Sequence, residues 1–487
     1  MNRAGRWPLS LCLAAALASC SGGGSPTSNA PTPTPTPPPG GTPTPTPPPT
    51  TGACSLSNRQ DFAFDTLDEW YLFPNLLATN VNKANYSDLQ SYIDALVAPA
   101  RAQGRDRFFT YVTSIQEEED LINSGATAGF GFRLMYFNDG GNLRVFVSDS
   151  LEGAPALGQN IDRGDELLGV STQGGTMLLV NSLPATSGGV STLINALGPD
   201  TPGTTRVLRI QYLGGAQMDV TLAKADFNIQ PVSPRFGVET FNNNGTTVGY
   251  VNLRTFASLT GSSQLRDAFQ TFKNQGITQV IVDLRYNGGG LVSVAELFGD
   301  LMLANRVGQV FSYTTLRSSK SSLNETDNIG SQSQAIAATK IAFIGTGSTA
   351  SASELVINAI PPYLGNNVAL IGENTYGKPV GQFAFDLDAC DDRLRVVAFR
   401  TENADNEGDY YNGLATTMPR TCQAIDDIFT PMGSASEDMI ATALDWLRTG
   451  TCTAISGGLK TTQGVSGSGL LQPERPTTVQ REVPGLF

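Results

Sequence analysis

Apolar and polar positions follow two different periods over the second half of the chain. The runs 278–284 and 368–372 are almost continuously apolar, which is typical of strands buried on both faces. Between such runs the apolar residues recur at helical spacing, as Leu265, Phe269 and Phe272 do. This order predicts βαβ units and a largely parallel sheet. The expected strands are 248–253, 278–284, 340–345 and 368–372, and the expected helices are 262–276, 291–302, 353–360 and 434–447.

The pattern differs in the first half of the folded part. Residues 54–123 are rich in apolar and aromatic residues at helical spacing, which predicts a small helical unit. Ser87-x-x-Gln90 resembles a capping box, and Ser262 is the predicted cap of a later helix. Residues 124–225 instead show short alternating runs between glycine turns, which predicts a β-rich domain.

A glycine–aromatic loop opens this β-rich domain. Gly129, Phe130, Gly131 and Phe132 precede an alternating strand, and small residues followed by Gly-Asp-x-Leu come later. Together these segments resemble a circularly permuted bacterial PDZ domain. The resemblance implies that the loop offers backbone N–H groups to the terminal carboxylate of a peptide, which adds a strand to the sheet. The alternative is a small β-domain without a peptide site.

The first 19 residues resemble a bacterial export signal, with Arg3 and Arg6 before a short apolar run. The run ends in Leu-Ala-Ser-Cys20, which resembles a lipobox and implies cleavage before Cys20 and lipidation of its thiol. An ordinary secretory signal with a chance cysteine is the alternative. Residues 20–53 contain two Thr-Pro-rich repeats and are expected to form an extended linker. Residues 451–487 are expected to form a loose tail.

Cysteine usage agrees with export. Besides Cys20 and one cysteine inside the signal, the chain has Cys54, Cys390, Cys422 and Cys452. Four cysteines in an oxidising compartment predict two disulfides, and four free thiols are the alternative. Of the three pairings that four cysteines allow, we expect Cys390–Cys422 and Cys54–Cys452. The second bond would join the two ends of the folded part.

Charge and histidine content narrow the classes of function. The chain has 31 Lys and Arg residues against 44 Asp and Glu residues, a formal net charge of -13, which argues against a nucleic-acid partner. It has no histidine, which excludes Ser-His-Asp and Cys-His catalysis and histidine-ligated metal sites. A general base in this chain must be Lys, Asp, Glu, Tyr or Cys.

Three segments that follow predicted strands carry candidate chemistry. Val282–Gly290 ends in three glycines, whose N–H groups can face a ligand closely. Gly347–Glu354 places Ser351 at a turn from strand to helix. Thr375–Gln382 contains Lys378, which burial would make able to act as a base. The simpler interpretations are a plain turn, a helix cap and a solvated surface charge.

In this order the three segments resemble the motifs of the carboxyl-terminal processing peptidases, also called tail-specific proteases. The resemblance covers about residues 60–450. It implies an α/β fold with a crotonase-like αβ peptidase core over residues 226–450. The helical unit of residues 54–123 and the PDZ-like domain of residues 124–225 would be the small N-terminal unit and the inserted domain of that fold.

The same resemblance assigns roles to residues of this chain. It implies that Ser351 is the nucleophile, that Lys378 is the general base and that Gln382 orients the lysine. The oxyanion hole would use the N–H of Ala352 and one N–H of the glycine loop, from Gly288 or Gly289. The loop here reads Asn-Gly-Gly-Gly where the family commonly has Asn-Pro-Gly-Gly, which leaves the choice between the two glycines open.

The predicted function is that of an exported, lipid-anchored serine endopeptidase of the bacterial cell envelope, at the periplasmic or outer-membrane side. Its partners would be polypeptides with unstructured apolar C-termini, and the membrane through Cys20. The resemblance implies no metal and no cofactor, and it leaves the oligomeric state open. One alternative is a catalytically inactive, PDZ-type peptide-binding lipoprotein. Another is a crotonase-like enzyme that acts on a thioester and needs no Ser–Lys pair.

Overall fold

The computed structural model of the chain describes residue 52 and the ranges 54–456 and 467–487. The predicted export signal, Cys20 and the Thr-Pro-rich repeats lie outside the described residues. Within the described ranges, none of the helices combines the length and the hydrophobicity that a membrane span requires.

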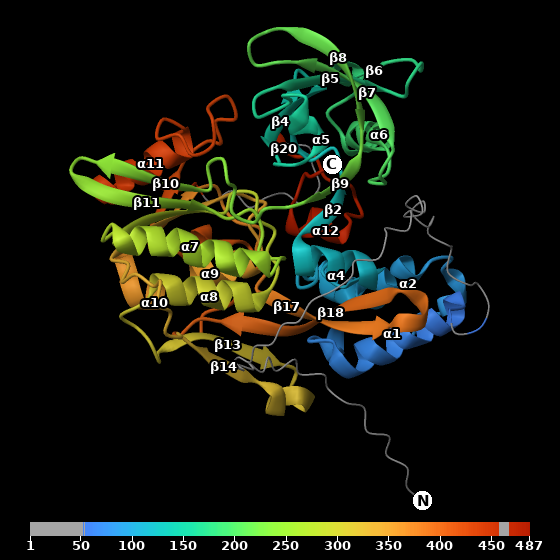
Figure 1. Ribbon diagram of the computed structural model, residues 1–487. Coiled ribbons are helices and arrows are strands. Elements are labelled where there is room, and N and C mark those ends of the chain that lie inside the picture. The colour runs from blue at the N-terminus through green and yellow to red at the C-terminus, as the bar shows by residue number, and fades with distance from the viewer. Residues whose placement is uncertain (1–51, 53, 457–466) are drawn as a thin grey trace, which may run out of the picture. The chain divides into compact units, whose positions relative to one another are not determined.

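A six-stranded sheet forms the centre of the second half of the chain (Figure 1). Its strand order is β10-β11-β12-β15-β16-β19, and neighbours from β11 to β19 run parallel, whereas β10 pairs antiparallel with β11. The predicted parallel sheet is thus confirmed. The bounds are β10 (Val238–Asn243), β11 (Thr246–Asn252), β12 (Gln279–Asp283), β15 (Lys340–Gly345), β16 (Val368–Gly372) and β19 (Thr421–Gln423).

Helices cover both faces of this sheet, which explains its continuous apolar runs. Val280 and Val282 of β12 pack in one core with side chains of α7, α8 and α9, while Ile281 packs in a second core with α11. All three side chains are fully buried, because successive residues of a strand point to opposite faces. The helices are α7 (Thr260–Asn274), α8 (Val292–Met302), α9 (Ala352–Ala359), α10 (Pro361–Leu364) and α11 (Asp438–Thr449).

A second, five-stranded antiparallel sheet packs with the N-terminal helices. Its path is β1-β18-β13-β14, with β17 paired to β18, and none of these strands was predicted from the sequence. Leu67 of α1, Ile93 of α2 and Val396 of β18 share one core. The elements are α1 (Leu56–Trp70), α2 (Leu89–Leu96), α3 (Ala98–Ala102), β1 (Tyr111–Ser114), α4 (Ile115–Ser124), β13 (Val310–Leu316), β14 (Glu325–Asn328), β17 (Val380–Leu387) and β18 (Asp392–Glu402).

Three helix starts differ from the prediction by more than one residue or by the capping residue. The helix at residue 89 is capped by Asp88 rather than by Ser87, since the Asp88 carboxylate accepts the N–H of Ser91 (2.8 Å). Helix α7 begins at Thr260, two residues before the predicted cap Ser262. Helix α11 begins at Asp438 after the cap Glu437, whereas the predicted helix opened at residue 434. In all three cases the period of the apolar residues located the helix correctly, and the predicted start or cap was wrong.

The β-rich unit contains a seven-stranded sheet of order β20-β3-β4-β5-β7-β8, with β6 paired to β5 (upper right in Figure 1). Strands β2 and β9 form an antiparallel pair where the chain enters and leaves this unit. The elements are β2 (Ala126–Gly129), β3 (Phe132–Asp139), β4 (Asn142–Ser150), α5 (Pro155–Gly158), β5 (Glu166–Ser171), β6 (Leu178–Leu179), α6 (Ser187–Leu197), β7 (Thr205–Gln211), β8 (Gln217–Ala223) and β9 (Ala225–Asn228).

Residues 467–487, here named the closing segment, are not the loose tail that the sequence predicted. They contain β20 (Ser468–Leu470), which pairs with β3, and the short helix α12 (Thr478–Glu482). Leu471, Leu486 and Phe487 are buried. The prediction failed because single apolar residues between prolines and glycines show no period, and their burial depends on surfaces from distant parts of the chain.

The four cysteines form two disulfides, but the predicted pairing is wrong. The bonds are Cys54–Cys390 and Cys422–Cys452, with Cα atoms 5.3 and 5.4 Å apart. Cys390 lies in the turn between β17 and β18, beside the start of α1, whereas Cys422 lies on β19 of the other sheet. The two partners that we expected to pair therefore belong to different sheets.

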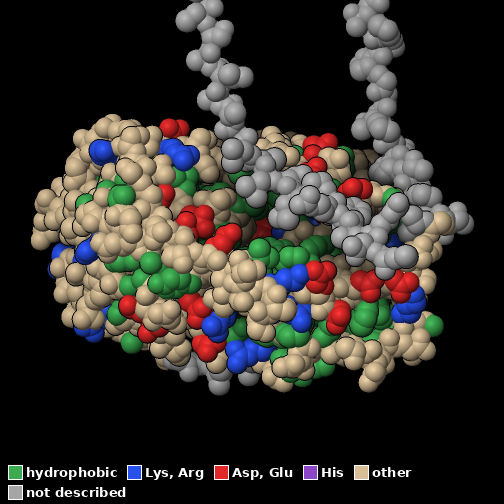
Figure 2. Space-filling view, turned by 90° about the horizontal axis from the view of Figure 1, so that it is seen from below, with side chains coloured by type: hydrophobic (Ala, Val, Ile, Leu, Met, Phe, Trp, Pro, Cys, Tyr) green, Lys and Arg blue, Asp and Glu red, His purple; other side chains and the backbone are tan. Residues whose placement is uncertain are grey.

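Charges of both signs are interspersed on the face that Figure 2 shows, and hydrophobic areas lie between them. Several half-buried cations of the described chain lie beside a carboxylate, as Lys83 does beside Asp61 and Lys320 beside Glu69. Charge of one sign is thus divided among several small areas of this face.

Candidate active site

Three loops meet at one edge of the six-stranded sheet. β12, β15 and β16 are parallel neighbours, so the residues that follow them lie side by side at the carboxyl ends of the strands. Ala350 N–H donates to the Asn287 carbonyl (3.1 Å), and Tyr376 N–H donates to the Thr349 carbonyl (2.9 Å). The fold therefore brings together all three motif segments that the sequence singled out.

Ser351 lies at the sharp turn between β15 and α9. Its φ is 54° and its ψ is -117°, a conformation that is uncommon for residues other than glycine and costs about 1–3 kcal/mol. Such a strained turn from strand to helix is the geometry that presents a serine nucleophile at the edge of an α/β sheet. Ala352 is the first residue of α9, so its N–H lies at the positive end of the helix dipole.

The glycine loop after β12 approaches Ser351 closely. A Cβ atom on Gly289 would lie 2.8 Å from the Ser351 Cβ and 3.1 Å from the Ala352 nitrogen, so only glycine fits there. The Gly289 N–H donates to the Asn287 side-chain oxygen (2.9 Å), whereas the Gly288 N–H donates to the carbonyl of Glu482 (3.0 Å). Of the two glycines left open by the sequence, Gly288 is the one whose N–H faces a carbonyl from another segment.

Glu354 connects the serine loop to the lysine loop, and the sequence analysis assigned it no role. One oxygen of this fully buried carboxylate accepts the Ser351 N–H (3.1 Å) and the Lys378 N–H (2.7 Å). The other oxygen accepts the Thr375 hydroxyl (2.6 Å) and the Gly377 N–H (2.7 Å). Burial raises the pKa of Glu354, and the four hydrogen bonds oppose that rise. The sequence signal that could have found this role is an acidic residue at the third position of the helix that follows the serine loop.

Lys378 is held by two residues from different units. Its ammonium group donates to the Gln382 side-chain oxygen (2.8 Å) and lies 5.2 Å from the centre of the Phe109 ring. The Gln382 amide nitrogen in turn donates to the Phe109 carbonyl. The helical N-terminal unit, which the sequence predicted to serve only in packing, thus contributes Phe109 to the surroundings of the lysine.

The electrostatic surroundings favour a neutral form of Lys378. Burial lowers the pKa of Lys378, and the Arg481 charge acts in the same direction, while Glu482, Asp106 and Glu354 oppose this. A lysine with a lowered pKa is neutral, and can accept a proton, at a lower pH than an exposed lysine. Among the described residues no hydrogen bond joins Lys378 directly to Ser351; the connection runs through the backbone N–H groups that Glu354 binds.

The closing segment crosses this site. Besides the bond from Gly288 to the Glu482 carbonyl, a Cβ atom on Gly288 would lie 2.0 Å from the Arg481 carbonyl oxygen. The Arg481 side chain points elsewhere: it donates to the Phe108 carbonyl (2.9 Å) and lies 3.9 Å from the centre of the Tyr111 ring. One Glu482 carboxylate oxygen is buried without a hydrogen-bond partner among the described residues. Sequence reasoning missed this contact completely.

The same segment then reaches the glycine–aromatic loop of the β-rich unit. Gly131 N–H donates to the Phe487 carbonyl (2.8 Å), and Phe487 N–H donates to the Phe132 carbonyl (3.0 Å). Leu134 N–H donates to the Gly485 carbonyl (2.9 Å), and Leu486 forms an antiparallel bridge with Arg133. The segment therefore adds backbone pairing to β3, beside Gly129, Phe130, Gly131 and Phe132.

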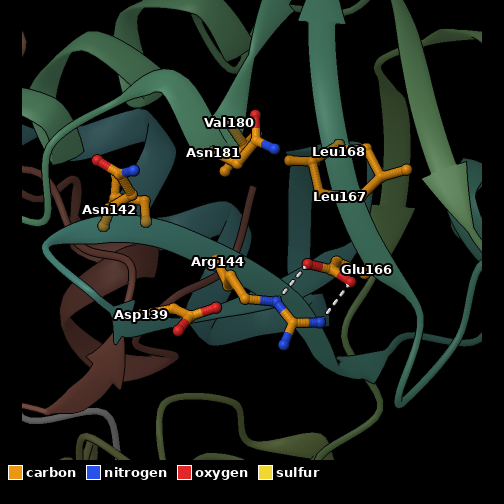
Figure 3. Close-up of a pocket in the computed structure, with 9 residues that line it drawn as sticks. Asp139, Asn142, Arg144, Glu166, Leu167, Leu168, Val180 and Asn181 are labelled. Atoms are coloured by element: carbon orange, nitrogen blue, oxygen red, sulfur yellow. Dashed lines mark hydrogen bonds and ion pairs between the residues drawn. The ribbon is translucent and has the colours of Figure 1, made fainter.

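A separate cavity of about 320 Å³ opens in the β-rich unit (Figure 3). Arg144 and Glu166 lie side by side in its lining, joined by two hydrogen bonds of 2.8 Å. Asp139, Asn142 and Asn181 complete its polar lining. None of the residues that line this cavity belongs to the three motif segments, so the cavity is distinct from the candidate active site.

Comparison with known proteins identifies the part of the chain that carries the motifs. Residues 247–413 match the model of Peptidase family S41. An Arabidopsis thaliana carboxyl-terminal-processing peptidase 2 is 28% identical over 276 residues, which are 54% of this chain and 48% of that protein. The carboxy-terminal processing protease CtpA of Bacillus subtilis is 24% identical over 58% of this chain and 54% of its own length. The chain thus spans about half the length of these curated relatives.

A solved structure shares the fold. A Bacteroides fragilis protein assigned to the S41 proteases aligns with a TM-score of 0.61 at 20% identity, over 80% of this chain and 97% of its own chain. At this identity the likeness concerns the fold alone. It agrees with the α/β fold of this chain.

Proposed function

Because residues 247–413 match the model of Peptidase family S41, we propose that this chain is a serine endopeptidase of the carboxyl-terminal processing type, with Ser351 and Lys378 as its catalytic pair. The observation that carries the proposal is the junction of the three loops, in which Glu354 binds the backbone of both residues. The proposed substrates are polypeptides with unstructured, apolar C-terminal ends.

In the proposed acylation step Lys378 is neutral and takes the proton of the Ser351 hydroxyl. The serine oxygen attacks the carbonyl carbon of a substrate peptide bond, and a tetrahedral oxyanion forms. The N–H groups of Ala352 and Gly288 stabilise this oxyanion; one such donor is worth about 10²–10³ in rate. Gln382 keeps the lysine in place by accepting one of its hydrogen bonds.

In the next step Lys378 returns the proton that it took from Ser351, this time to the leaving amine. The carbon–nitrogen bond breaks as Lys378 gives its proton to the leaving amine, which leaves an ester between Ser351 and the substrate. Water then attacks the ester with the neutral lysine as base, and the serine hydroxyl is restored. The glycine–aromatic loop at Gly129–Phe132 is proposed to bind the end of the substrate by strand addition, as in PDZ domains.

The proposed location is the bacterial cell envelope. The signal-like residues before Cys20 and the Thr-Pro-rich linker support export and attachment through a lipidated Cys20. Labelling with a radioactive or alkyne fatty acid tests this directly: the wild-type protein should incorporate label, and the Cys20→Ala variant should not. Equal labelling of the two would exclude Cys20 as the lipidation site.

Turnover of β-casein tests the peptidase activity. The wild-type chain should cleave it, and Ser351→Ala should reduce kcat/KM by at least about 10⁴-fold with an unchanged melting temperature. Ser348→Ala is the matched control, because this serine lies in the same loop outside the catalytic contacts, and it should retain activity. Cleavage by the Ser351→Ala variant at the wild-type rate would refute the assignment. The proposal of an inactive peptide-binding lipoprotein predicts no turnover by any of the three.

A further inference from the structure

The closing segment occupies two sites of the molecule at once. At one end of the contact, the Glu482 carbonyl lies on the Gly288 N–H beside Ser351. At the other end, the Phe487 carbonyl lies on the Gly131 N–H, and residues 485–487 pair with β3. Both loops thus hold a carbonyl of the same short stretch of backbone.

We propose that residues 478–487 are a built-in ligand that blocks the active site and the groove of the β-rich unit in the same molecule. We further propose that their features define the class of peptide that the groove binds. This inference rests on the proposed peptidase function. A substrate end that displaces the segment must reproduce its features, which are backbone pairing with β3 and a large apolar side chain at the position of Phe487.

The burial of the last two side chains of the segment indicates a specific fit to the groove. The Phe487 side chain is 3% exposed and packs in the core of the β-rich unit with Phe130 and Phe132. Leu486 is 4% exposed and packs in a different cluster, with Leu121 of α4. Successive side chains thus enter opposite sides, as expected for an added strand. The pocket that holds the Phe487 side chain would make the groove select peptides with a large apolar residue at this position.

The segment is held as an inhibitor and not as a productive substrate. Residues 478–482 form the helix α12, and the Val483 N–H donates to the Val479 carbonyl (2.7 Å). The N–H of Val483, whose nitrogen would leave on cleavage after Glu482, is therefore held by a hydrogen bond of the helix. In addition, the Glu482 charge stabilises the protonated form of the lysine.

Covalent attachment makes this ligand a strong competitor. A tethered ligand acts at an effective concentration of about millimolar, whereas a free polypeptide end is present at far lower concentration. With an intrinsic Kd of about 10–100 μM for the segment itself, a free end would lose roughly 10–100-fold in apparent affinity while the segment is in place. Removing the segment should restore that affinity.

A binding measurement tests the inference without turnover. The probe is a fluorescent peptide with the sequence of residues 478–487, and both proteins carry Ser351→Ala. The chain that lacks residues 478–487 should bind the probe at least about 10-fold more tightly than the full chain. A probe with Asp in place of the final Phe is the matched control and should bind weakly. Equal binding of the probe to the two proteins would overturn the inference.

A turnover measurement uses a point variant in the full chain. Phe487→Asp should raise kcat/KM for β-casein by roughly 10-fold, since a buried carboxylate releases the segment from its pocket. Leu323→Asp, an exposed apolar residue far from both sites in the sequence, is the control and should leave the rate unchanged. Should Phe487→Asp fail to fold, binding of the fluorescent 478–487 peptide to the full and the shortened chain still tests the inference.

The outcomes separate this inference from the proposed function. Probe binding that depends on the segment, in a protein that hydrolyses nothing, would keep the built-in ligand and refute the peptidase. Hydrolysis that is indifferent to the segment would keep the peptidase and refute the built-in ligand. Intact mass is the last check: loss of residues 483–487 from the wild type but not from Ser351→Ala would show a substrate instead of an inhibitor.

Discussion

Two glycine-rich loops of this molecule hold the same segment in different ways. The loop of Gly288 and the loop of Gly131 each donate one backbone N–H, at 3.0 and 2.8 Å, to a carbonyl of the closing segment. At Gly288 the side chain of the neighbouring Arg481 turns away to Phe108 and Tyr111. At Gly131 the Phe487 side chain is buried in a core.

The difference suggests how chemistry and selectivity are divided. The loop after β12 contacts the segment through main-chain atoms, so it can receive the carbonyl of many different residues. The loop before β3 adds an apolar pocket, so it can distinguish one side chain from another. Under this division, variants of the loops around Ser351 should abolish turnover but keep peptide binding. Variants of the glycine–aromatic loop should weaken peptide binding but keep turnover.

The largest expected effect is that of Lys378→Met. Loss of the base should lower kcat/KM for β-casein by about 10⁴-fold, as removal of one member of a catalytic set does. Binding of the 478–487 probe to the chain that lacks residues 478–487 should persist, because the groove is unchanged. A large loss of probe binding in this variant would show that the two loops do not act separately.

Glu354→Gln should follow, with a loss of about 10²-fold in kcat and little change in KM. The carboxylate only accepts hydrogen bonds and receives four, whereas an amide would turn N–H groups against two of the donors. The melting temperature should fall as well. To separate positioning from stability, the pH dependence of the residual activity is compared with that of wild type; an identical profile would leave Glu354 a purely structural role.

A matched pair of glycine substitutions tests the loop after β12 sterically. Gly288→Ala places a Cβ 2.0 Å from the Arg481 carbonyl oxygen, and it should lower turnover by about 10²-fold because a substrate carbonyl is displaced from the oxyanion donor. Gly214→Ala is the control, since a Cβ there meets no atom within 4 Å. Unchanged kinetics in Gly288→Ala would remove Gly288 from the oxyanion hole.

The pH dependence should show about a tenfold rise in kcat/KM per pH unit below the pKa of Lys378, followed by a plateau. The rise has this sign because the base must be neutral, and burial brings the plateau below the pH of an exposed lysine. The check is kcat/KM of the wild type for β-casein measured across pH. A rate that does not rise with pH would contradict a neutral lysine as the base.

The smallest effect is expected for Gly129→Ala. A Cβ at this position would lie 2.9 Å from the Phe487 carbonyl carbon, so the segment should leave the groove. Turnover of β-casein should rise by no more than roughly 10-fold, while the affinity for the 478–487 probe should fall. A fall in both would place Gly129 on the catalytic side of the comparison.

Much of the fold was predictable from the sequence. The strands at residues 340–345 and 368–372 have the predicted bounds, because a strand buried on both faces must be apolar at every position. The five-stranded antiparallel sheet was not predicted, since its strands mix polar and apolar residues with bulges in β13 and β17. Helix periods were located correctly, while the cap Asp88 and the start of α7 at Thr260 were not.

Some residues of the candidate site could likewise be predicted from the sequence, and others could not. Ser351, Lys378 and Gln382 could be singled out, because each belongs to a short local motif with a resemblance to a known family. Glu354 as a bridge, Phe109 as a partner of the lysine, and the true disulfides Cys54–Cys390 and Cys422–Cys452 could not. These depend on contacts between residues that are far apart in the chain.

The sequence by itself determined that a histidine-free chain must use another base, that its core is a parallel α/β sheet, and which loops carry the candidate chemistry. These properties are local: they follow from residue type and from the period of apolar positions. Only the tertiary structure decided that Gly288 faces a carbonyl and that residues 478–487 lie across both glycine loops. Such a segment has no period of its own, and its order comes from surfaces that exist only after the rest of the chain has folded.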